Sequence, residues 1–287
     1  MNIEAAAKQF FQNLINKKKS VGTITEYQKD LKMFLSYLQK EDVLDIKAVR
    51  GSHMDSYLNS LIAERHYKPS SRNRQMNTLR SFFKYCKKAG LVDENHAEGL
   101  ERLNEEKAER VYLTSDEVRC LIKAIEHRLI KLVVLTLFFT GARINECLNL
   151  ELQDIDFEHQ TLTIRNGKGN KTRKIPLHHE LGFALKDYIK NWRVQFSTNK
   201  LFLTERSGSL SDVYVNRVLK ETVKKLKWDK NVTCHVLRHS FASALVQGSA
   251  NIGAVKELLG HASLKTTSSY VHIQRASVEE AIQKLGI

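Results

Sequence analysis

The chain has 287 residues, enough for about two domains, and its 46 Lys and Arg against 32 Asp and Glu give a formal net charge of +14. Because the basic residues are spread along the chain, a polyanionic partner is expected, most often nucleic acid, with a merely solvated basic surface as the alternative. The four cysteines lack paired spacing, no signal-peptide pattern is present, and the apolar run 129–139 is shorter than the ~20 residues of a spanning helix, so we expect a reduced, cytoplasmic protein and exclude a membrane protein.

The first part of the chain carries the spacing of amphipathic helices. An apolar stripe begins after Thr23 or Thr25, either of which can cap that helix, and the same spacing returns over residues 46–67. We therefore predict a helical domain over residues 1–100. A charged linker without an apolar stripe should follow over residues 101–112.

A further helix after Pro69 has one apolar and one basic face. Pro69 breaks the chain, Ser70 or Ser71 is the expected cap, and Gly90 the expected stop. The apolar face holds Met76, Leu79, Phe82, Phe83 and Cys86. The other face is expected to carry Arg72, Arg74, Arg80, Lys84, Lys87 and Lys88. The first four of these are candidate DNA-binding residues, because phosphate contact needs a one-sided basic face, although a solvated face fits the same pattern.

Residues 113–287 are expected to form a second domain. Thr114 and Glu117 have the spacing of a capping box, and a strongly apolar helix starts near Arg128. We expect that helix to contain Arg143. Its guanidinium then needs an anion, and a structural pair with a nearby glutamate remains an alternative to a functional arginine.

The clearest β pattern lies in the middle of this second domain. Residues 161–164 alternate and are β-branched, an Asn-Gly turn follows, and residues 174–177 return as a second strand. Lys168 and Lys171 lie in or beside the hairpin tip. Residues 201–203 are expected to add a third, short strand. The predicted fold class is therefore mainly α with a small antiparallel β-sheet, in two domains.

Toward the C-terminus, a set of polar side chains is placed at helix ends or on one helix face. His235 and Arg238 are three residues apart, so they share one face of a helix. Gly260 is expected to end a helix and to place His261 just beyond it. A further short helix would present Tyr270. Together these groups suit a phosphodiester better than a peptide or a sugar.

Two other kinds of functional site, a zinc site and an ATP site, have partial signals in the sequence. His235 and His239 have a zinc-compatible spacing, but Val236 stands where the zincin pattern requires Glu. Residues 167–172 faintly resemble a phosphate loop, but they lack the required order and no helix follows, so we reject an ATP site. Taken singly, a lysine at a hairpin tip or a lone tyrosine is more often part of an ordinary surface.

Taken together, these residues resemble the tyrosine recombinase (phage integrase) family, as a compact Xer-like member. The six positions, in order, are Arg143, Lys168, His235, Arg238, His261 and Tyr270. The matching local strings are residues 140–146, 167–171, 235–242, 258–261 and 270–272. The first domain looks like the family's helical core-site-binding domain, through residues 80–85 and 93–97. His96 and Asn145 depart from the family pattern, but neither occupies a catalytic position.

The resemblance implies DNA strand exchange through a covalent 3′-phosphotyrosyl intermediate and a Holliday junction, without a metal or other cofactor. Arg143 and Arg238 would grip the non-bridging phosphate oxygens and stabilise the charge of a pentavalent phosphorus, which fits bidentate guanidinium chemistry. His261 would donate a further hydrogen bond to the same oxygens. We expect Glu146 to orient Arg143 or a neighbouring residue.

The remaining positions would move protons and form the covalent bond. Tyr270 would attack the phosphorus, and His235 would accept its proton. Lys168, on a hairpin that can move toward DNA, would protonate the departing 5′-oxygen. Lys171 is expected to bind phosphate only.

The resemblance also implies how the protein assembles. Its partner would be double-stranded DNA with specific core sites, bound by a homotetramer arranged as a dimer of dimers. Residues 276–287 have helical spacing and should form a C-terminal helix that docks on the neighbouring protomer, with packing on its own domain as the alternative. A partner recombinase or accessory protein is a further expected partner. Resolution of replicon or transposon dimers, or integration and excision of a mobile element, would be the biological role.

Three rival functions remain open at this point. A type IB topoisomerase would share the chemistry but relax supercoils alone. A DNA-binding regulator would keep the fold with a decayed active site, although six filled positions oppose decay. A metal hydrolase would use His235, His239 and His261 as ligands.

Overall fold

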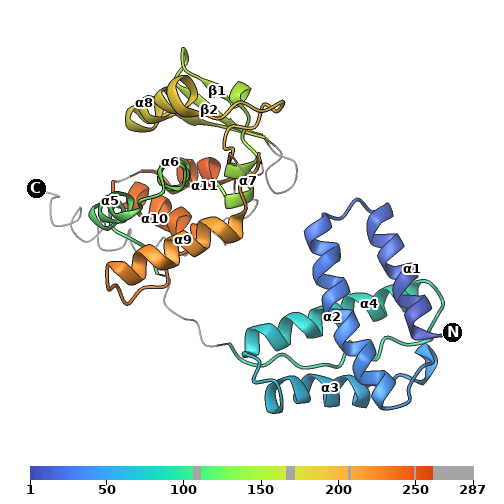
Figure 1. Cartoon of the computed structure of the whole chain (residues 1–287). Coiled ribbons are helices and arrows are strands. Elements are labelled where there is room, and N and C mark those ends of the chain that lie inside the picture. The colour runs from blue at the N-terminus through green and yellow to red at the C-terminus, as the bar shows by residue number, and fades with distance from the viewer. Residues whose placement is uncertain (106–110, 166–171, 206–207, 249, 261–287) are drawn as a thin grey trace, which may run out of the picture. The chain divides into compact units, whose positions relative to one another are not determined.

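The computed structural model describes residues 1–105, 111–165, 172–205, 208–248 and 250–260. The chain divides into two compact units, Met1–Ala108 and Glu109–Ile287, drawn in Figure 1. The division falls inside the charged segment 101–112. In the described part of the chain, no helix combines the length and the apolar character needed to cross a membrane.

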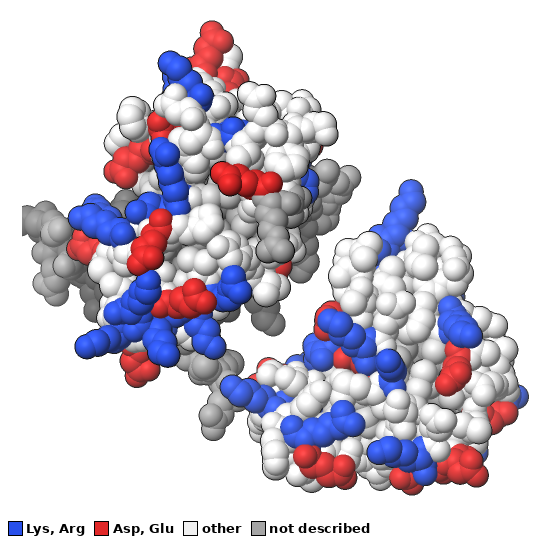
Figure 2. All heavy atoms as spheres, viewed as in Figure 1, with Lys and Arg blue, Asp and Glu red and all other residues white. Residues whose placement is uncertain are grey.

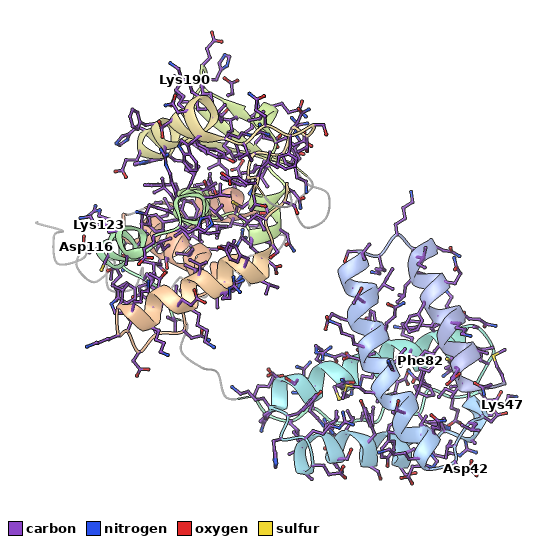
Figure 3. The ribbon with its side chains drawn as sticks, viewed as in Figure 1. Asp42, Lys47, Phe82, Asp116, Lys123 and Lys190 are labelled. Atoms are coloured by element: carbon purple, nitrogen blue, oxygen red, sulfur yellow. The ribbon has the colours of Figure 1, made fainter. Side chains whose placement is uncertain are left out.

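The first unit is a set of helices around its own apolar core. Its elements are α1 (Ile3–Asn16), α2 (Val21–Lys40), the 3₁₀ turn Ile46–Ala48, α3 (Gly51–Ala63) and α4 (Pro69–Lys88). Phe82 of α4, labelled in Figure 3, lies in this core with its ring centroid 5.5 Å from that of Phe10 in α1. Helix α1 carries five buried residues, so it belongs to the core as fully as the predicted helices.

Three of the predicted helix starts in this unit are wrong. The N-cap of α2 is Ser20, whose hydroxyl accepts a hydrogen bond from the amide of Thr23, so Thr23 and Thr25 lie inside the helix. The segment 46–67 divides into a 3₁₀ turn and a helix that begins only at Gly51. Helix α4 begins at Pro69 rather than after it, because proline fits the first helical turn, where its missing N–H has no acceptor to lose.

The second unit contains all of the β-strands in the described chain. Its elements are α5 (Ser115–Ala124), α6 (Arg128–Thr140), α7 (Ile144–Leu148), the 3₁₀ turn Leu152–Asp154, β1 (Ile155–Asp156), β2 (Thr161–Ile164), β3 (Arg173–Pro176), α8 (His179–Asp187) with its π-helical end Tyr188–Trp192, α9 (Asp212–Lys225), α10 (Cys234–Gln247) and α11 (Ile252–Leu259). The capping box before α5 is confirmed: Thr114 and Glu117 exchange reciprocal backbone–side-chain hydrogen bonds of 2.9 and 3.2 Å.

The sheet is antiparallel, with the order β1-β2-β3. Leu162 pairs with Ile155 on one side and with Ile175 on the other. The third strand is therefore residues 155–156, and the prediction of a strand over residues 201–203 is wrong. That segment is buried in the core, where an isolated bridge between Glu151 and Lys200 precedes it and the Tyr188 hydroxyl donates to the carbonyl of Leu201.

Helix α6 is the central helix of the second unit. Its residues are buried on most sides, as expected for a helix that is apolar all round. It packs against α5, α7, α8 and α10, and its C-terminal end meets α10 beside the break that leads to α7. The core thus brings the ends of several helices to one place, where the candidate site lies.

Candidate functional site

Arg143 lies in the connection between α6 and α7, not inside a helix as predicted. Gly141 takes the left-handed conformation (φ 58°) that ends α6, and Arg143 is extended (φ −69°, ψ 150°) as the residue before α7. Because α6 stops before it, the arginine is placed at a helix junction. Its side chain is 32% exposed, and Nη1 donates to Oε1 of Glu146 at 2.7 Å. The predicted Arg143–Glu146 pair is therefore present, with the guanidinium partly open to solvent.

The carboxylate of Glu146 is shared by two arginines. Its Oε2 accepts hydrogen bonds from the amide of Arg143 (2.9 Å) and from Nη2 of Arg173 (2.7 Å). Burial alone would raise the pKa of Glu146, but the hydrogen bonds and charges of Arg173 and Arg143 outweigh burial and lower the pKa to about 2. The group therefore stays ionised and holds Arg143 in one orientation.

Arg173 is the residue that sequence reasoning missed. It is the first residue of β3, and its side chain is only 8% exposed. A signal was present, since Arg173 and the buried Ile175 are two residues apart and share one face of the strand. A charged residue on the core face of a strand needs a buried partner. Here that partner is Glu146.

Arg238 is brought to the same junction by α10. The helix begins after Thr233, whose hydroxyl accepts from the amide of Val236. The guanidinium of Arg238 is buried, and it donates to the carbonyl oxygens of Gly141 (2.5 Å) and Leu259 (2.6 Å). Since Gly141 precedes Arg143 by two residues, both arginines meet at the α6–α7 break.

The two histidines of α10 differ from Arg238 in exposure. His235, in the first turn, is exposed, while His239 is half-buried, and their ring centroids lie 4.5 Å apart with the planes at 83°. His235 therefore stands at the surface end of the helix that carries the buried Arg238. An exposed imidazole beside an anchored arginine can exchange a proton with a group that arrives from solvent.

The C-terminal end of α11 completes the described part of the site. Gly260 has φ 63° and ends the helix, which confirms the predicted stop. The last carbonyls of α11 accept hydrogen bonds from two buried arginines: Arg173 donates to Leu258 O and Arg238 donates to Leu259 O. Cations favour the C-terminal end of a helix, where the carbonyls lack partners. These two bonds fix the point from which the chain continues to His261.

Three of the predicted catalytic residues, Lys168, His261 and Tyr270, lie outside the described residues. So do Lys171 and the helix predicted over residues 276–287. The described structure thus brings together Arg143, His235 and Arg238, with Glu146 and Arg173 as their supports.

The described residues hold one group that could bind a metal ion. His178, His179 and Glu180 offer ligand atoms within 4.8 Å of one another. They lie at the start of α8. The His178 ring stacks on Phe139 with the ring centroids 4.0 Å apart, and its Nδ1 accepts a hydrogen bond from the amide of Glu180 at 3.3 Å. Capping and stacking account for the position of His178, and a cation there would face the positive end of the helix dipole.

The predicted basic face of α4 divides into two kinds of residue. Arg72 is buried, and its Nη1 donates to the backbone carbonyl of Glu101, so its placement on the exposed face is wrong. Arg80 is half-buried and donates to the carbonyls of Ala97 and Leu100. Both arginines fasten residues 97–101 along α4, because a long arginine can reach backbone carbonyls of a neighbouring segment.

Arg74 and Lys84 remain on the solvent side of α4. The exposed or half-exposed positions recur three or four residues apart, at Arg74, Asn77, Ser81, Lys84 and Lys88. Arg74 is 46% exposed and contacts both carboxylate oxygens of the buried Asp30 at 2.6 Å. The exposed stripe of α4 therefore combines cations with two uncharged polar side chains.

The second unit has a further basic surface on α9 and the turn after it. Its exposed cations are Arg217, Lys220, Lys224, Lys225 and Lys227. Figure 2 shows Lys and Arg side chains gathered over this helix. Of these five cations, only Lys225 pairs with a carboxylate of another element within the described residues, with Glu126 at 2.8 Å. Such a concentration of cations favours a polyanionic partner.

Comparison with known proteins covers nearly the whole chain. Residues 111–277 match the model described as the phage integrase family, and residues 7–90 match the phage integrase N-terminal SAM-like domain. A tyrosine recombinase of Thermosipho africanus is 33% identical over 277 residues, which cover 94% of this chain and 95% of that protein. Tyrosine recombinase XerC of Oceanobacillus iheyensis is 31% identical, covering 94% and 92%.

Solved structures share the fold. A lambda integrase (75–356) dimer bound to a COC′ core site aligns with a TM-score of 0.78 at 20% identity, covering 94% of this chain and 95% of that one. The XerH site-specific recombinase bound to palindromic difH aligns with a TM-score of 0.73 at 24% identity, covering 93% and 80%. The mainly helical class with a small antiparallel sheet, predicted from the sequence, is confirmed.

Proposed function

Because the chain belongs to the phage integrase family and is a tyrosine recombinase of the Xer type, we propose that it cuts and rejoins duplex DNA at specific core sites through a covalent 3′-phosphotyrosyl intermediate. Strand exchange would proceed in two steps through a Holliday junction. Resolution of replicon or transposon dimers, or integration and excision of a mobile element, is the proposed role.

The observation that carries this proposal is the convergence of Arg143 and Arg238 on one helix break. Arg238 donates to Gly141, and Arg143 follows two residues later, held by Glu146. Two guanidinium groups at one junction suit the non-bridging oxygens of a single phosphate. Their fixed charges would stabilise the additional negative charge of the pentavalent transition state without reorganisation during the reaction.

The proton transfers are assigned to residues on either side of this pair. Tyr270 would attack the phosphorus, forming a phosphotyrosyl bond as the bond to the 5′-oxygen breaks. His235, exposed on the first turn of α10, would take the phenolic proton. Lys168 would give a proton to the leaving 5′-oxygen, and His261 would hydrogen-bond the phosphate. The phosphotyrosyl ester conserves the energy of the broken phosphodiester, so rejoining needs no nucleotide.

DNA binding by the first unit is assigned to the exposed stripe of α4. Arg74 and Lys84 offer cations to the phosphate backbone, with Asn77 and Ser81 between them as hydrogen-bonding groups. Arg72 and Arg80 would act indirectly by fixing the segment that follows α4. The net charge of +14 supports binding to a polyanion by both units.

The proposed assembly is a homotetramer on two DNA sites. Residues 276–287 would dock on the neighbouring protomer, so that cleavage by Tyr270 depends on a complete complex. A partner recombinase or accessory protein would select the biological outcome. Deleting residues 276–287 should leave single-site binding intact but abolish strand exchange, whereas a self-packing helix predicts loss of stability instead.

Covalent capture tests the reaction without knowledge of the target site. The full chain is incubated with fragments of its source genome and with a random-sequence duplex pool, and SDS-resistant adducts are isolated and sequenced. The wild-type protein should enrich one related set of sites, and Tyr270→Phe should bind DNA but give no adduct. Tyr214→Phe, which removes a hydroxyl from a half-buried tyrosine of the same unit, is the matched control and should retain adduct formation.

The same captured site separates the rival functions. A recombinase exchanges strands between two captured sites, whereas a type IB topoisomerase relaxes plasmid supercoils without exchange. A metal hydrolase would lose activity in EDTA, and a regulator would bind without any adduct. Adducts that persist in Tyr270→Phe would overturn the assignment of the nucleophile.

A further inference from the structure

Arg173 joins three elements of the site through one buried guanidinium. It begins β3, its Nη2 donates to Oε2 of Glu146 on α7 at 2.7 Å, and its Nε donates to the carbonyl of Leu258 on α11 at 2.7 Å. Its side chain is 8% exposed, and its Nη2 and Nε are both engaged by groups of the protein. Its contacts are with the groups that hold other residues in place.

The carboxylate of Glu146 links Arg173 to Arg143. One oxygen, Oε1, accepts from Nη1 of Arg143, while the other, Oε2, accepts from Arg173 and from the backbone amide of Arg143. A carboxylate is planar and rigid, so the orientation fixed at one oxygen determines the direction of the bond at the other. Arg173, together with the backbone amide of Arg143, therefore sets the angle at which Glu146 holds the Arg143 guanidinium. This relay does not depend on any contact between the two arginines.

The end of α11 is shaped to receive Arg173. A Cβ atom at Gly260 would lie 3.1 Å from Nη1 and 3.3 Å from Cδ of Arg173. Glycine is thus required at position 260 for two reasons, its φ of 63° and the close approach of this side chain. The next carbonyl, that of Leu259, is held by Arg238. Arg173 and Arg238 together fasten the last turn of α11 against β3 and α10.

We propose that Arg173 is a positioning residue that sets the orientation of Arg143 through the shared carboxylate of Glu146 and makes that orientation depend on the docking of α11. This rests on the proposed function, in which Arg143 neutralises charge on the scissile phosphate. When the last turn of α11 moves away, Arg173 loses the acceptor at Leu258, and the side-chain donor at Oε2 of Glu146 is then no longer held in a fixed position. The phosphate-binding arginine is thereby coupled to the segment that leads toward His261 and Tyr270.

Loss of this relay should affect one specific part of the reaction. Misplacement of a catalytic group by about 1 Å can slow a reaction by about 100-fold. If the misplaced group is Arg143, the loss should fall on neutralisation of the phosphate charge and not on DNA binding. A methylphosphonate at the scissile position has one non-bridging oxygen replaced by methyl and carries no charge, so its cleavage needs less help from Arg143.

The test compares single-turnover cleavage of two duplexes that carry the site captured by the wild-type protein. One has a normal scissile phosphate and the other a methylphosphonate. Relative to wild type, Arg173→Gln should cleave the phosphate about 100-fold more slowly, but the methylphosphonate within about threefold, with unchanged DNA affinity. Glu146→Gln should behave alike, and the double variant should lose little more than either single change, because both act through one network.

Arg165→Gln is the matched control. Arg165 directly follows β2, beside the start of β3, and pairs with the buried carboxylate of Asp154. It therefore tests the loss of a sheet arginine and its buried ion pair without touching Arg143 or α11. We expect equal, small effects of Arg165→Gln on both substrates.

Each outcome has a defined meaning. Equal slowing of both substrates by Arg173→Gln would show a merely structural role and overturn the inference. A wild-type protein that forms no adduct with any duplex overturns the proposed function and, with it, the inference. If Arg173→Gln does not fold, Arg173→Lys decides, because its single ammonium keeps the charge but cannot bridge Glu146 and Leu258 together. It should then show the same substrate selectivity with a smaller loss, and absence of that selectivity overturns the inference.

Discussion

The guanidinium of Arg238 and the backbone carbonyl of Gly141 lie 2.5 Å apart, across 97 residues of sequence. This bond ties α10 to the break between α6 and α7, and it places Arg238 beside the connection that carries Arg143. The break exists because Gly141 adopts a left-handed conformation that ends α6. Both the bond and the break therefore depend on the residue at position 141.

Gly141→Ala should destabilise the second unit by about 2–4 kcal/mol, from a left-handed alanine and overpacking of the core. A Cβ at this position would lie 2.7 Å from Cε1 of Phe241 and 3.0 Å from Cδ2 of Leu259. Gly90→Ala is the control: Gly90 also has a positive φ (69°), but nothing lies within 4 Å of its Cβ position. The control should cost only about 1–2 kcal/mol. Denaturant unfolding measures both, and equal costs would contradict a packing requirement at Gly141.

Glu146 should make the stability of the second unit depend on pH in the acid range. Its folded pKa of about 2 lies below the ordinary value of 4.5, so the unfolded chain binds the proton more tightly. The stabilisation is complete above pH 4.5 and is lost as the pH falls toward 2, in total about 3 kcal/mol. In Glu146→Gln, the pH dependence of the unfolding free energy between pH 5 and pH 2 should flatten by about that amount. If the pH dependence is unchanged in Glu146→Gln, Glu146 is not its source.

Lys84 and Arg72 on α4 should give opposite phenotypes. Lys84 is exposed, so Lys84→Ala should lower the slope of log affinity against log salt by about 0.9 per lost phosphate contact and leave unfolding unchanged. Arg72 is buried against the segment after α4, so Arg72→Ala should lower stability without changing the salt slope. Fluorescence anisotropy with a labelled duplex, across a salt series, measures the slope. The reverse pattern would mean that Arg72 reaches DNA and Lys84 does not.

Ser240 should stabilise the second unit because its hydroxyl oxygen accepts a hydrogen bond. The amide of Leu113, just before the capping residue of α5, donates to Oγ of Ser240 at 2.8 Å, and both residues are buried. Ser240→Ala leaves that amide without a partner and should cost about 1–3 kcal/mol. Thr136→Val is the control, since the buried Thr136 hydroxyl only donates to a helix carbonyl of its own turn. Thermal unfolding should separate the two variants, and a similar small shift in both would contradict the role of the Leu113 bond.

The sequence by itself determined the local ends of several elements. The capping box at Thr114, the buried helix from Arg128, the stop at Gly260 and the paired strands all follow from interactions within a few residues of the chain, although the second strand is 173–176 and not the predicted 174–177. The motifs around Arg143 and Arg238 also identified the family, which the comparisons confirm. Side-chain type and spacing are enough for such inferences because the partners are close in sequence. The roles of Lys168, His261 and Tyr270 stay predictions.

Only the tertiary structure decided which charged residues face the protein and which face solvent. Arg72 lies on the same helix as Lys84, yet its guanidinium is buried because residues 97–101 return along that side of α4. In the sequence, Arg173 looks like one more cation beside a hairpin. In the structure, it donates to Glu146, 27 residues away, and to Leu258, 85 residues away, and so holds both elements of the site. Burial of a charge depends on where distant segments of the chain pack, because desolvation must be offset by partners that the local sequence does not contain.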